Sequence, residues 1–270
     1  MPLFEKLKRG FIALSARAPE GTAKDTSPLA HPSFQLILTL ILLMELAFAA
    51  WAFLFSHSHT TEIAMTTGLH AAYFFADWVV MMVAMMFPAA ALMILAFYKA
   101  QAVRHADEGF GSTWVFVTAY LLMWAVAGMA AYAGALVAES AAIHASLGPV
   151  VAAQFGAAIL LIAGLYQFTP LKEKCLSECR TPIDMTTWHH DTAGSFRMGL
   201  LHGAYCLGCN WLLFAALFPL GMTVGAMAVI TLVILAEKTL PWPTSASYTA
   251  GVVLVLYGAV LIASPLLTIH

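Results

Sequence analysis

The chain has 270 residues, of which 61% are hydrophobic and only 10% are charged, and its mean hydropathy is +0.85. Soluble domains carry roughly 25% charged residues, so this composition excludes a water-soluble globular domain and a disordered chain. A net charge of −2 gives no surface for nucleic acid, and four cysteines are too few for a disulfide-stapled secreted fold. The composition predicts a protein whose solvent is lipid.

Seven apolar runs approach the length of about 20 residues that a membrane-spanning helix needs. They are residues 34–55, 74–98, 113–138, 148–168, 199–219, 222–238 and 248–267. We therefore predict an all-α polytopic transmembrane helix bundle of about seven spans within residues 34–270, after a flexible cytoplasmic tail of residues 1–33. A short turn, Pro219-Leu220-Gly221, separates the fifth and sixth runs, so a re-entrant hairpin is the alternative for this pair.

The basic residues predict the orientation of this bundle. All 12 Lys and Arg residues fall in the tail, in the second and fourth connections, or at the end of the sixth run. If the chain crosses the membrane seven times, the tail, these two connections and the end of the sixth run all lie on the same side of the membrane. Because Lys and Arg next to spans are retained in the cytoplasm, we expect a cytoplasmic N-terminus and a C-terminus outside.

Three acidic residues lie inside predicted spans, where a charged side chain costs about 3 kcal/mol. Asp77 is near the outer end of the second span and Glu237 near the inner end of the sixth, so both can reach an interface, and Glu237 can pair with a cation such as Lys238. Glu45 is midway along the first span. We expect Glu45 to face the bundle interior as a proton carrier, metal ligand or hydrogen-bond anchor.

The second run is rich in methionine. Two Met-x-x-x-Met pairs lie side by side on a helix, and they are Met81 with Met85 and Met82 with Met86. Such thioethers can pass a soft monovalent metal along the helix, or they can simply fill irregular gaps between helices. Pro88 cannot donate a hydrogen bond to the carbonyl of Ala84, so we expect a kink and a freed oxygen beside the methionines.

The fifth run places soft donors on one helix face. Met198, His202, Cys206 and Cys209 fall within about 80° of one another at 100° per residue. Thioether, imidazole and thiol groups suit Cu(I), with Zn(II) second. Gly199 and Gly203 predict close packing of another helix beside this face. The alternative is a packed interface with two small thiols and a hydrogen-bonded histidine.

These donors suggest a route through the membrane. If the second and fifth helices touch, their sulfur atoms converge near the middle of the bilayer beside Glu45. Outside, His57, His59 and His70 are a possible metal entry, although solvent-exposed loop histidines are the alternative. Inside, Cys175 and Cys179 in the polar segment 169–198 form a possible exit and share a face if that segment is helical.

Four strings carry a resemblance to a known family. They are AMMFPAA (84–90), AGLYQFTPLKEKCLSECRTP (163–182), FRMGLLHGAYCLGCNW (196–211) and EKTLP (237–241). They closely resemble the bacterial family of predicted metal-binding integral membrane proteins, which includes membrane copper chaperones of copper oxidases such as tyrosinase. The resemblance covers about residues 74–268. Its motif positions include His202, Cys206, Cys209, Cys175 and Cys179.

The resemblance implies copper handling in the inner membrane of a bacterium. Its expected partners are a copper ion and a client copper oxidase or soluble copper carrier, and oligomers are possible. The family pattern often has a further cysteine after the second helix cysteine, where this chain has Asn210. That difference implies a weaker three-thiolate site.

Three functions remain open at this point. The first is a membrane protein that delivers or moves Cu(I) without turnover, passively or coupled to protons through Glu45. The second is a transmembrane thiol-disulfide oxidoreductase with Cys206 and Cys209 as its active pair. It uses all four cysteines but leaves the methionines unexplained. The third is an auxiliary subunit of a membrane complex, in which the polar residues serve packing.

Overall fold

The computed structural model describes residues 32–66, 71–102, 109–144, 148–180 and 192–267. Every regular element in these ranges is a helix, which confirms the all-α prediction for the described part of the chain. The helices in chain order are α2 (Pro32–Thr66), α3 (Ala71–Ala102), α4 (Gly109–His144), α5 (Pro149–Tyr166), α6 (Pro170–Arg180), α7 (Thr192–Leu217), α8 (Val224–Thr239) and α9 (Pro243–Leu267).

Five of these helices are long and apolar enough to cross a membrane, which indicates a membrane protein. Their candidate spans are Phe34–His57, Ala71–Ala102, Gly109–Ala141, Thr192–Leu217 and Pro243–Ala263. A sixth is added if α5 and α6, bent by 64° at a short break, form one broken span. The 16 residues of α8 extend about 24 Å at 1.5 Å per residue, less than the roughly 30 Å of the hydrocarbon core. The count of seven and the sidedness of the termini stay predictions.

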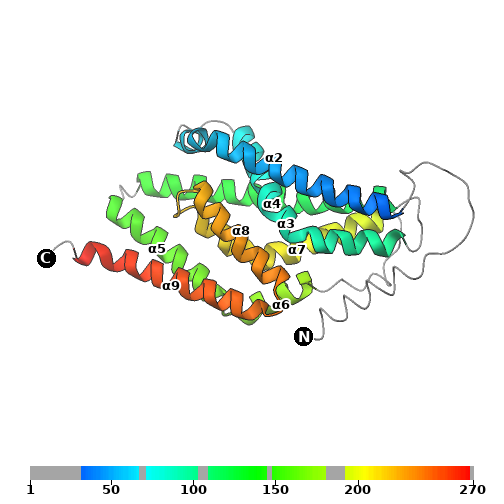
Figure 1. The fold of residues 1–270 in the computed structure, drawn as a ribbon. Helices are drawn as coiled ribbons and strands as arrows, with labels where there is room; N and C mark the ends of the chain where they lie inside the picture. Colours follow the sequence, from blue (N-terminus) through cyan, green and yellow to red (C-terminus); the bar gives the residue numbers. More distant parts are fainter. Residues whose placement is uncertain (1–31, 67–70, 103–108, 145–147, 181–191, 268–270) are drawn as a thin grey trace, which may run out of the picture.

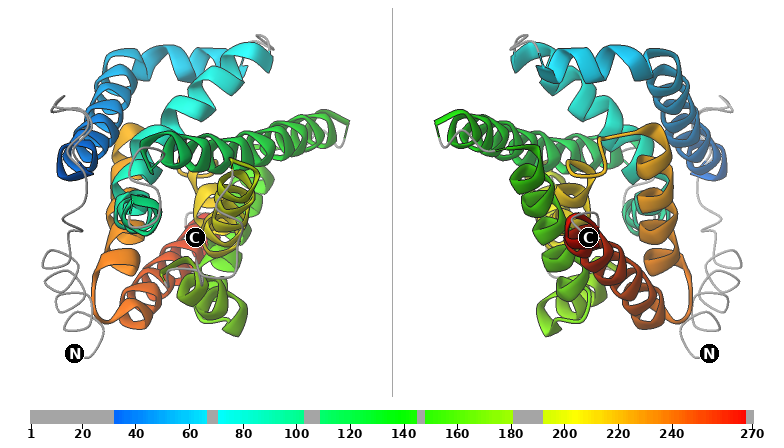
Figure 2. Two further views of the ribbon diagram at one scale, coloured as in Figure 1. Left: turned by 90° about the vertical axis from the view of Figure 1, so that its right-hand side faces the viewer. Right: turned by 90° about the vertical axis from the view of Figure 1, so that its left-hand side faces the viewer.

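The helices pack in a defined order around α3 and α7. Helix α2 packs along α3, which also contacts α4 and α8; α4 runs along α7, and α5 runs along α9 (Figure 1 and Figure 2). More than half of the most apolar part of α3 and of α7 is buried, whereas less than a quarter of that part of α2, α4 and α9 is buried. The interior of the bundle is therefore built on the two helices that carry the methionine and cysteine motifs.

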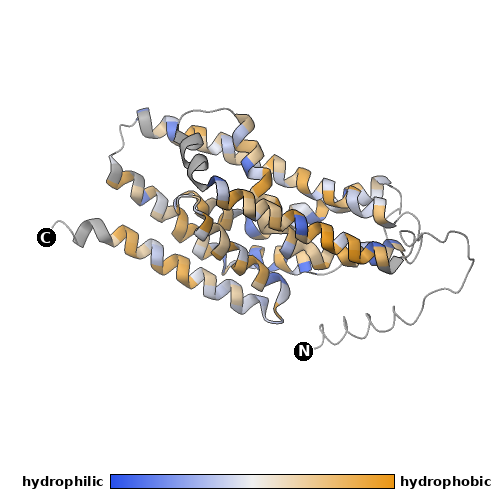
Figure 3. Ribbon diagram, turned by 45° about the horizontal axis from the view of Figure 1, so that its top comes forward, coloured by the Kyte–Doolittle hydropathy of each residue, from blue (hydrophilic) through white to orange (hydrophobic). Residues whose placement is uncertain are grey.

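The outer helices expose large apolar side chains. Phe48 on α2, Val137 on α4 and Leu256 on α9 each expose more than a third of their surface, and apolar residues run along the outside of the bundle in Figure 3. Soluble monomers rarely expose contiguous apolar surface of this extent. The outer surface therefore fits lipid.

The bent helix pair lies elsewhere than the sequence suggested. The expected turn at residues 219–221 does join α7 to α8, with Gly221 and Met222 at positive φ. The sharp bend, however, separates α5 from α6, and the segment expected to be a polar loop is helical from Pro170 to Arg180. Proline suits the first position of a helix because the missing N–H has no partner there, and the Thr169 Oγ1 accepts from the Lys172 N–H at 3.3 Å.

Candidate metal centre

Two glycines bring α7 against α4. A methyl group at Gly199 would lie 2.3 Å from the carbonyl oxygen of Phe116, and one at Gly203 would lie 2.8 Å from the Cβ of Met123. Neither position has room for a side chain. The close approach predicted from Gly-x-x-x-Gly is confirmed, and its partner is α4.

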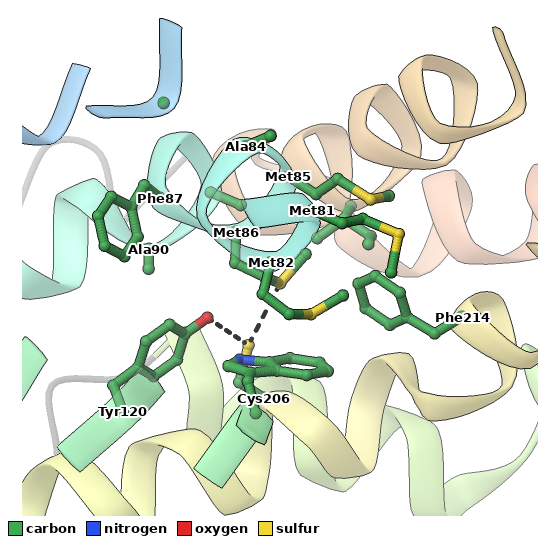
Figure 4. Close-up of a cluster of buried hydrophobic side chains, with 14 of the residues drawn as sticks. Met81, Met82, Ala84, Met85, Met86, Phe87, Ala90, Tyr120, Cys206 and Phe214 are labelled. Carbon is green, nitrogen blue, oxygen red and sulfur yellow. Dashed lines mark hydrogen bonds between the residues drawn. The ribbon is translucent and has the colours of Figure 1, made fainter. Parts of the chain in front are cut away.

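The sulfur of Cys206 lies where side chains of three other helices meet. The Tyr120 hydroxyl of α4 is 3.2 Å away, the Met86 Sδ of α3 is 4.0 Å away, and the Lys238 Nζ of α8 is 2.8 Å away. Cys206 is fully buried. Figure 4 shows Tyr120 and Met86 converging on it from different helices. The predicted contact between the second and fifth runs is thus confirmed at Met86 and Cys206.

Asn210 holds the two thiols of α7 in place. Its Nδ2 donates to the Cys209 Sγ at 3.2 Å and to the Cys206 carbonyl at 2.9 Å. The Cys209 thiol donates to the same carbonyl at 3.2 Å. The family resemblance implies the loss of a thiolate ligand at Asn210, and the structure shows in addition that its amide is hydrogen-bonded to the Cys209 sulfur.

Helix α6 adds a third thiol to this group. Cys179 is buried and lies within hydrogen-bonding reach of both Cys206 and Cys209. Cys175 is half-buried one turn earlier and contacts the position of Gly208 on α7. All four cysteines are free. The segment that carries Cys175 and Cys179 is helical, as their predicted shared face requires, and the bend before α6 places both cysteines against α7.

His202 is buried, and no residue in the described part of the chain forms a hydrogen bond with its ring. Its ring lies between Phe116 and Tyr120, with centroid distances of 5.7 and 5.6 Å. Neither ring nitrogen is hydrogen-bonded, and a buried polar group without a partner costs about 1–3 kcal/mol. The hydrogen bond expected for a core histidine is not formed by any described residue. The ring lies one helical turn from Cys206, and a ring nitrogen is available there to bind a metal ion.

The methionines of both predicted pairs are buried, namely Met81, Met82, Met85 and Met86. In Figure 4, Met82 and Met86 lie on the side of α3 that faces Cys206, and Met85 lies on the far side. Met198 is buried on α7, but eight residues of helix separate it from Cys206 by about 12 Å along the axis. The thioethers nearest the thiols are therefore those of Met82 and Met86.

The carbonyl oxygen freed by Pro88 has a partner. The indole Nε1 of Trp51 on α2 donates to the Ala84 oxygen at 3.0 Å. Pro88 itself lies inside α3, which continues to Ala102. The freed oxygen predicted from the sequence therefore joins α2 to α3 and is not left for a ligand.

A buried ion pair fixes α6 against α8. The Lys172 Nζ lies 2.8 Å from the Glu237 Oε2 and also donates to the Cys209 carbonyl at 2.7 Å. Ser247 donates to the other carboxylate oxygen at 2.8 Å, and Arg180 donates to the carbonyls of Glu237 and Leu240. Glu237 thus pairs with Lys172, and the suggested pairing with Lys238 is wrong because Lys238 points to Cys206.

Other predicted residues lie outside this cluster. Glu45 is exposed on α2, so the expected position inside the bundle is wrong; Leu43 and Ala47 occupy the buried face instead. Asp77 is half-buried at the outer part of α3. His57 is exposed, and its Nδ1 lies 3.1 Å from the Phe53 carbonyl on a helix rather than in a loop. The side chain of His59 and all of His70 lie outside the described residues.

Sequence reasoning missed two polar partners of Cys206. Tyr120 gave no signal, since an aromatic residue within an apolar run suggests packing. Lys238 was considered as a basic residue at a membrane end and as a partner of Glu237, but not as a partner of a thiol, although it stands in the EKTLP string. Its position in a motif that also holds Glu237 was the available signal.

Within the ranges that the structure describes, no group of three or more His, Cys, Asp or Glu side chains is arranged to hold a metal ion. Structural zinc sites need four such ligands in a tetrahedron. The cluster instead combines thiols from α6 and α7 with a thioether from α3. Donors of this kind suit a soft monovalent ion.

The comparisons agree with this chemistry. The sequence model of the PpoB2 family, described as a copper chaperone, matches residues 75–261. No curated protein and no solved structure matches the chain. The matched region includes the methionines of α3, all four cysteines and Lys238. Because the match covers more than half of the sequence, the chain belongs to the PpoB2 family of copper chaperones.

Proposed function

We propose that this membrane copper chaperone carries Cu(I) on Cys206 and Cys209 and hands it to a client copper protein. The observation that carries the proposal is the environment of Cys206, whose sulfur lies 4.0 Å from the Met86 thioether and beside a second and a third thiol. Family membership supports copper as the cargo. The apolar helices support a site inside a membrane.

The proposed ligands are two thiolates assisted by a thioether. Cys206 and Cys209 supply the thiolates, and Met86 is the nearest thioether. Cys179 is within reach as an exchanging ligand, and the unpaired ring of His202 is one turn away. Soft sulfur ligands favour Cu(I) over harder ions, so zinc is the less favoured cargo.

Transfer would proceed by exchange of one sulfur ligand for another. The half-buried Cys175 lies one turn from the buried Cys179 on α6. A Cu(I) ion held at Cys206 and Cys209 can gain Cys179 as a ligand before Cys175 offers it to a partner. On the opposite side, Met81 and Met82 continue from Met86 towards Asp77 and supply an entry. The proposal has three further parts. The client is a copper protein such as a copper oxidase, and delivery takes place at a bacterial inner membrane. The metal is captured on the outer side by His57, His59 and His70.

The oxidoreductase alternative is less well supported. Cys206 and Cys209 lie three residues apart on an uninterrupted helix, which does not favour disulfide geometry. It also gives no role to the buried methionines. The contact of Cys179 with Cys206 is its best support, and a disulfide between them in protein isolated without reductant would favour it. An auxiliary packing role would leave the unpaired nitrogens of His202 without a function.

The decisive experiment is Cu(I) binding by the purified protein, measured anaerobically in detergent against a chromogenic Cu(I) chelator. Wild type should retain Cu(I), and the variant with Cys206→Ser and Cys209→Ser should lose it. Met86→Leu should weaken binding, whereas Met93→Leu, a buried methionine two turns further along α3, should not. Full retention of copper by the double serine variant would overturn the proposed site.

A further inference from the structure

Lys238 ends α8 with its ammonium group among the thiols. Its Nζ lies 2.8 Å from the Cys206 Sγ, and its charge also acts on Cys179 and Cys209. A lysine near the end of an apolar helix could extend towards water, but the Lys238 side chain points towards the thiol of Cys206. Such a position requires a negative partner, and a thiolate supplies it.

The other charged groups near the thiols have different partners. Lys172 and Glu237 form their own ion pair at 2.8 Å, so together they add no net charge. Arg180 acts on Cys179, but its guanidinium donates to the carbonyls of Glu237 and Leu240 at the end of α8. Among the described charged side chains, Lys238 is the one hydrogen-bonded to a thiol sulfur.

A fixed positive charge at this place distinguishes metal ions by their own charge. Two thiolates and one Cu(I) ion sum to one negative charge, and the ammonium group of Lys238 brings the total to zero. Two thiolates and one Zn(II) ion are already neutral, so the same ammonium leaves one uncompensated positive charge. Uncompensated charge is strongly unfavourable in a buried site.

We propose that Lys238 is a specificity-determining residue that makes the thiol pair of α7 accept a monovalent soft cation and reject a divalent one. This inference rests on the proposed function of Cys206 and Cys209. It adds that the choice between Cu(I) and zinc is made by a countercharge from α8, in addition to the softness of the ligands. Lys238 acts through the thiolates and is not itself a ligand.

The test measures Cu(I) and Zn(II) affinities on the same purified protein, each against a chelator selective for that metal. Wild type and Lys238→Arg should both prefer Cu(I). Lys238→Met removes the charge with little change in side-chain length, and the ratio of Cu(I) to Zn(II) affinity should fall by about tenfold or more, since a unit charge at contact distance acts strongly in a low dielectric. Lys238→Gln keeps a hydrogen-bond donor without the charge and should behave like Lys238→Met.

Measuring both metals distinguishes the effect of removing the Lys238 charge from the effect of a disturbed site. A disturbed site binds both ions less well, whereas a loss of countercharge lowers the Cu(I) affinity relative to the Zn(II) affinity. An unchanged ratio in Lys238→Met, or in Lys238→Gln if the methionine variant does not fold, overturns the inference while Cu(I) binding by wild type still supports the proposed function. Failure of wild type to bind Cu(I) at all overturns both.

Discussion

Lys172 of α6 and Glu237 of α8 form an ion pair inside the bundle, with Nζ and Oε2 2.8 Å apart and with side-chain exposures of 1% and 0%. The pair joins two strings of the sequence that are 65 residues apart. Because Lys172 also donates to the Cys209 carbonyl at 2.7 Å, it ties the bent helix α6 to the thiol cluster of α7.

Removing one member of this pair should destabilise the protein strongly. Glu237→Gln leaves the Lys172 ammonium buried without a countercharge, and breaking a buried pair in this way costs about 3–5 kcal/mol. The variant that combines Lys172→Met with Glu237→Gln should lose less than Glu237→Gln alone. Thermal unfolding in detergent measures both. A double variant that loses as much stability as Glu237→Gln, or more, would contradict the view that the unpaired ammonium causes the loss.

The hydrogen bond from Trp51 to the Ala84 carbonyl predicts a second coupling. Trp51→Phe leaves that oxygen without a donor, because Pro88 has no N–H, and should cost about 1–3 kcal/mol. With Pro88→Ala in the same chain, the new N–H can donate to Ala84 within the helix and the cost of Trp51→Phe should shrink. The comparison uses thermal unfolding of the two single variants and the double variant. Strictly additive effects would argue against the exchange of donors.

Gly199 on α7 has no space for a side chain. Gly199→Ala places a methyl group 2.3 Å from the Phe116 carbonyl oxygen, and overpacking of this kind costs about 1–3 kcal/mol. Because α4 carries Tyr120, the same change should also weaken Cu(I) binding. Gly134→Ala is the control, since nothing lies within 4 Å of its position on α4. Similar melting temperatures for the two variants would contradict the predicted contact.

The sequence predicts where the helices of this fold lie along the chain better than it predicts which face of each helix points into the bundle. Apolar runs placed α3, α4, α7 and α9 correctly because length and hydropathy are properties of the run itself. Glu45 was expected inside and is exposed, because a run that is apolar on every side does not show which face packs against α3. Helix rotation is set by neighbours such as Leu43 and Ala47, whose burial only the assembled bundle reveals.

The thiol cluster was predicted in part for a related reason. Helical periodicity placed His202, Cys206 and Cys209 on one face of α7, and this local geometry needs no tertiary information. The position of Cys179 depends on the 64° bend before α6, and that of Lys238 depends on how α8 crosses α7. The chemical type of a lysine suggests water, so its inward direction could not be inferred without the negative sulfur that it meets.

Asn210 provides the last prediction, since its amide lies beside both thiols of α7. Its Nδ2 lies 3.2 Å from the Cys209 Sγ and 3.8 Å from the Cys206 Sγ, so a sulfur atom introduced here would lie close to both thiols. Asn210→Cys should therefore bind Cu(I) about tenfold more tightly, a gain of roughly 1.4 kcal/mol. Asn210→Ser is the matched control, because serine has nearly the same size as cysteine but no thiol. It should bind Cu(I) more weakly than wild type, since the amide of Asn210 no longer orients Cys209. Chelator competition under reducing conditions compares the three proteins. If Asn210→Cys binds no more tightly than Asn210→Ser, the metal does not approach the sulfur atoms from the side of Asn210. The third sulfur ligand would then have to come from the thioethers of α3 or from the thiols of α6.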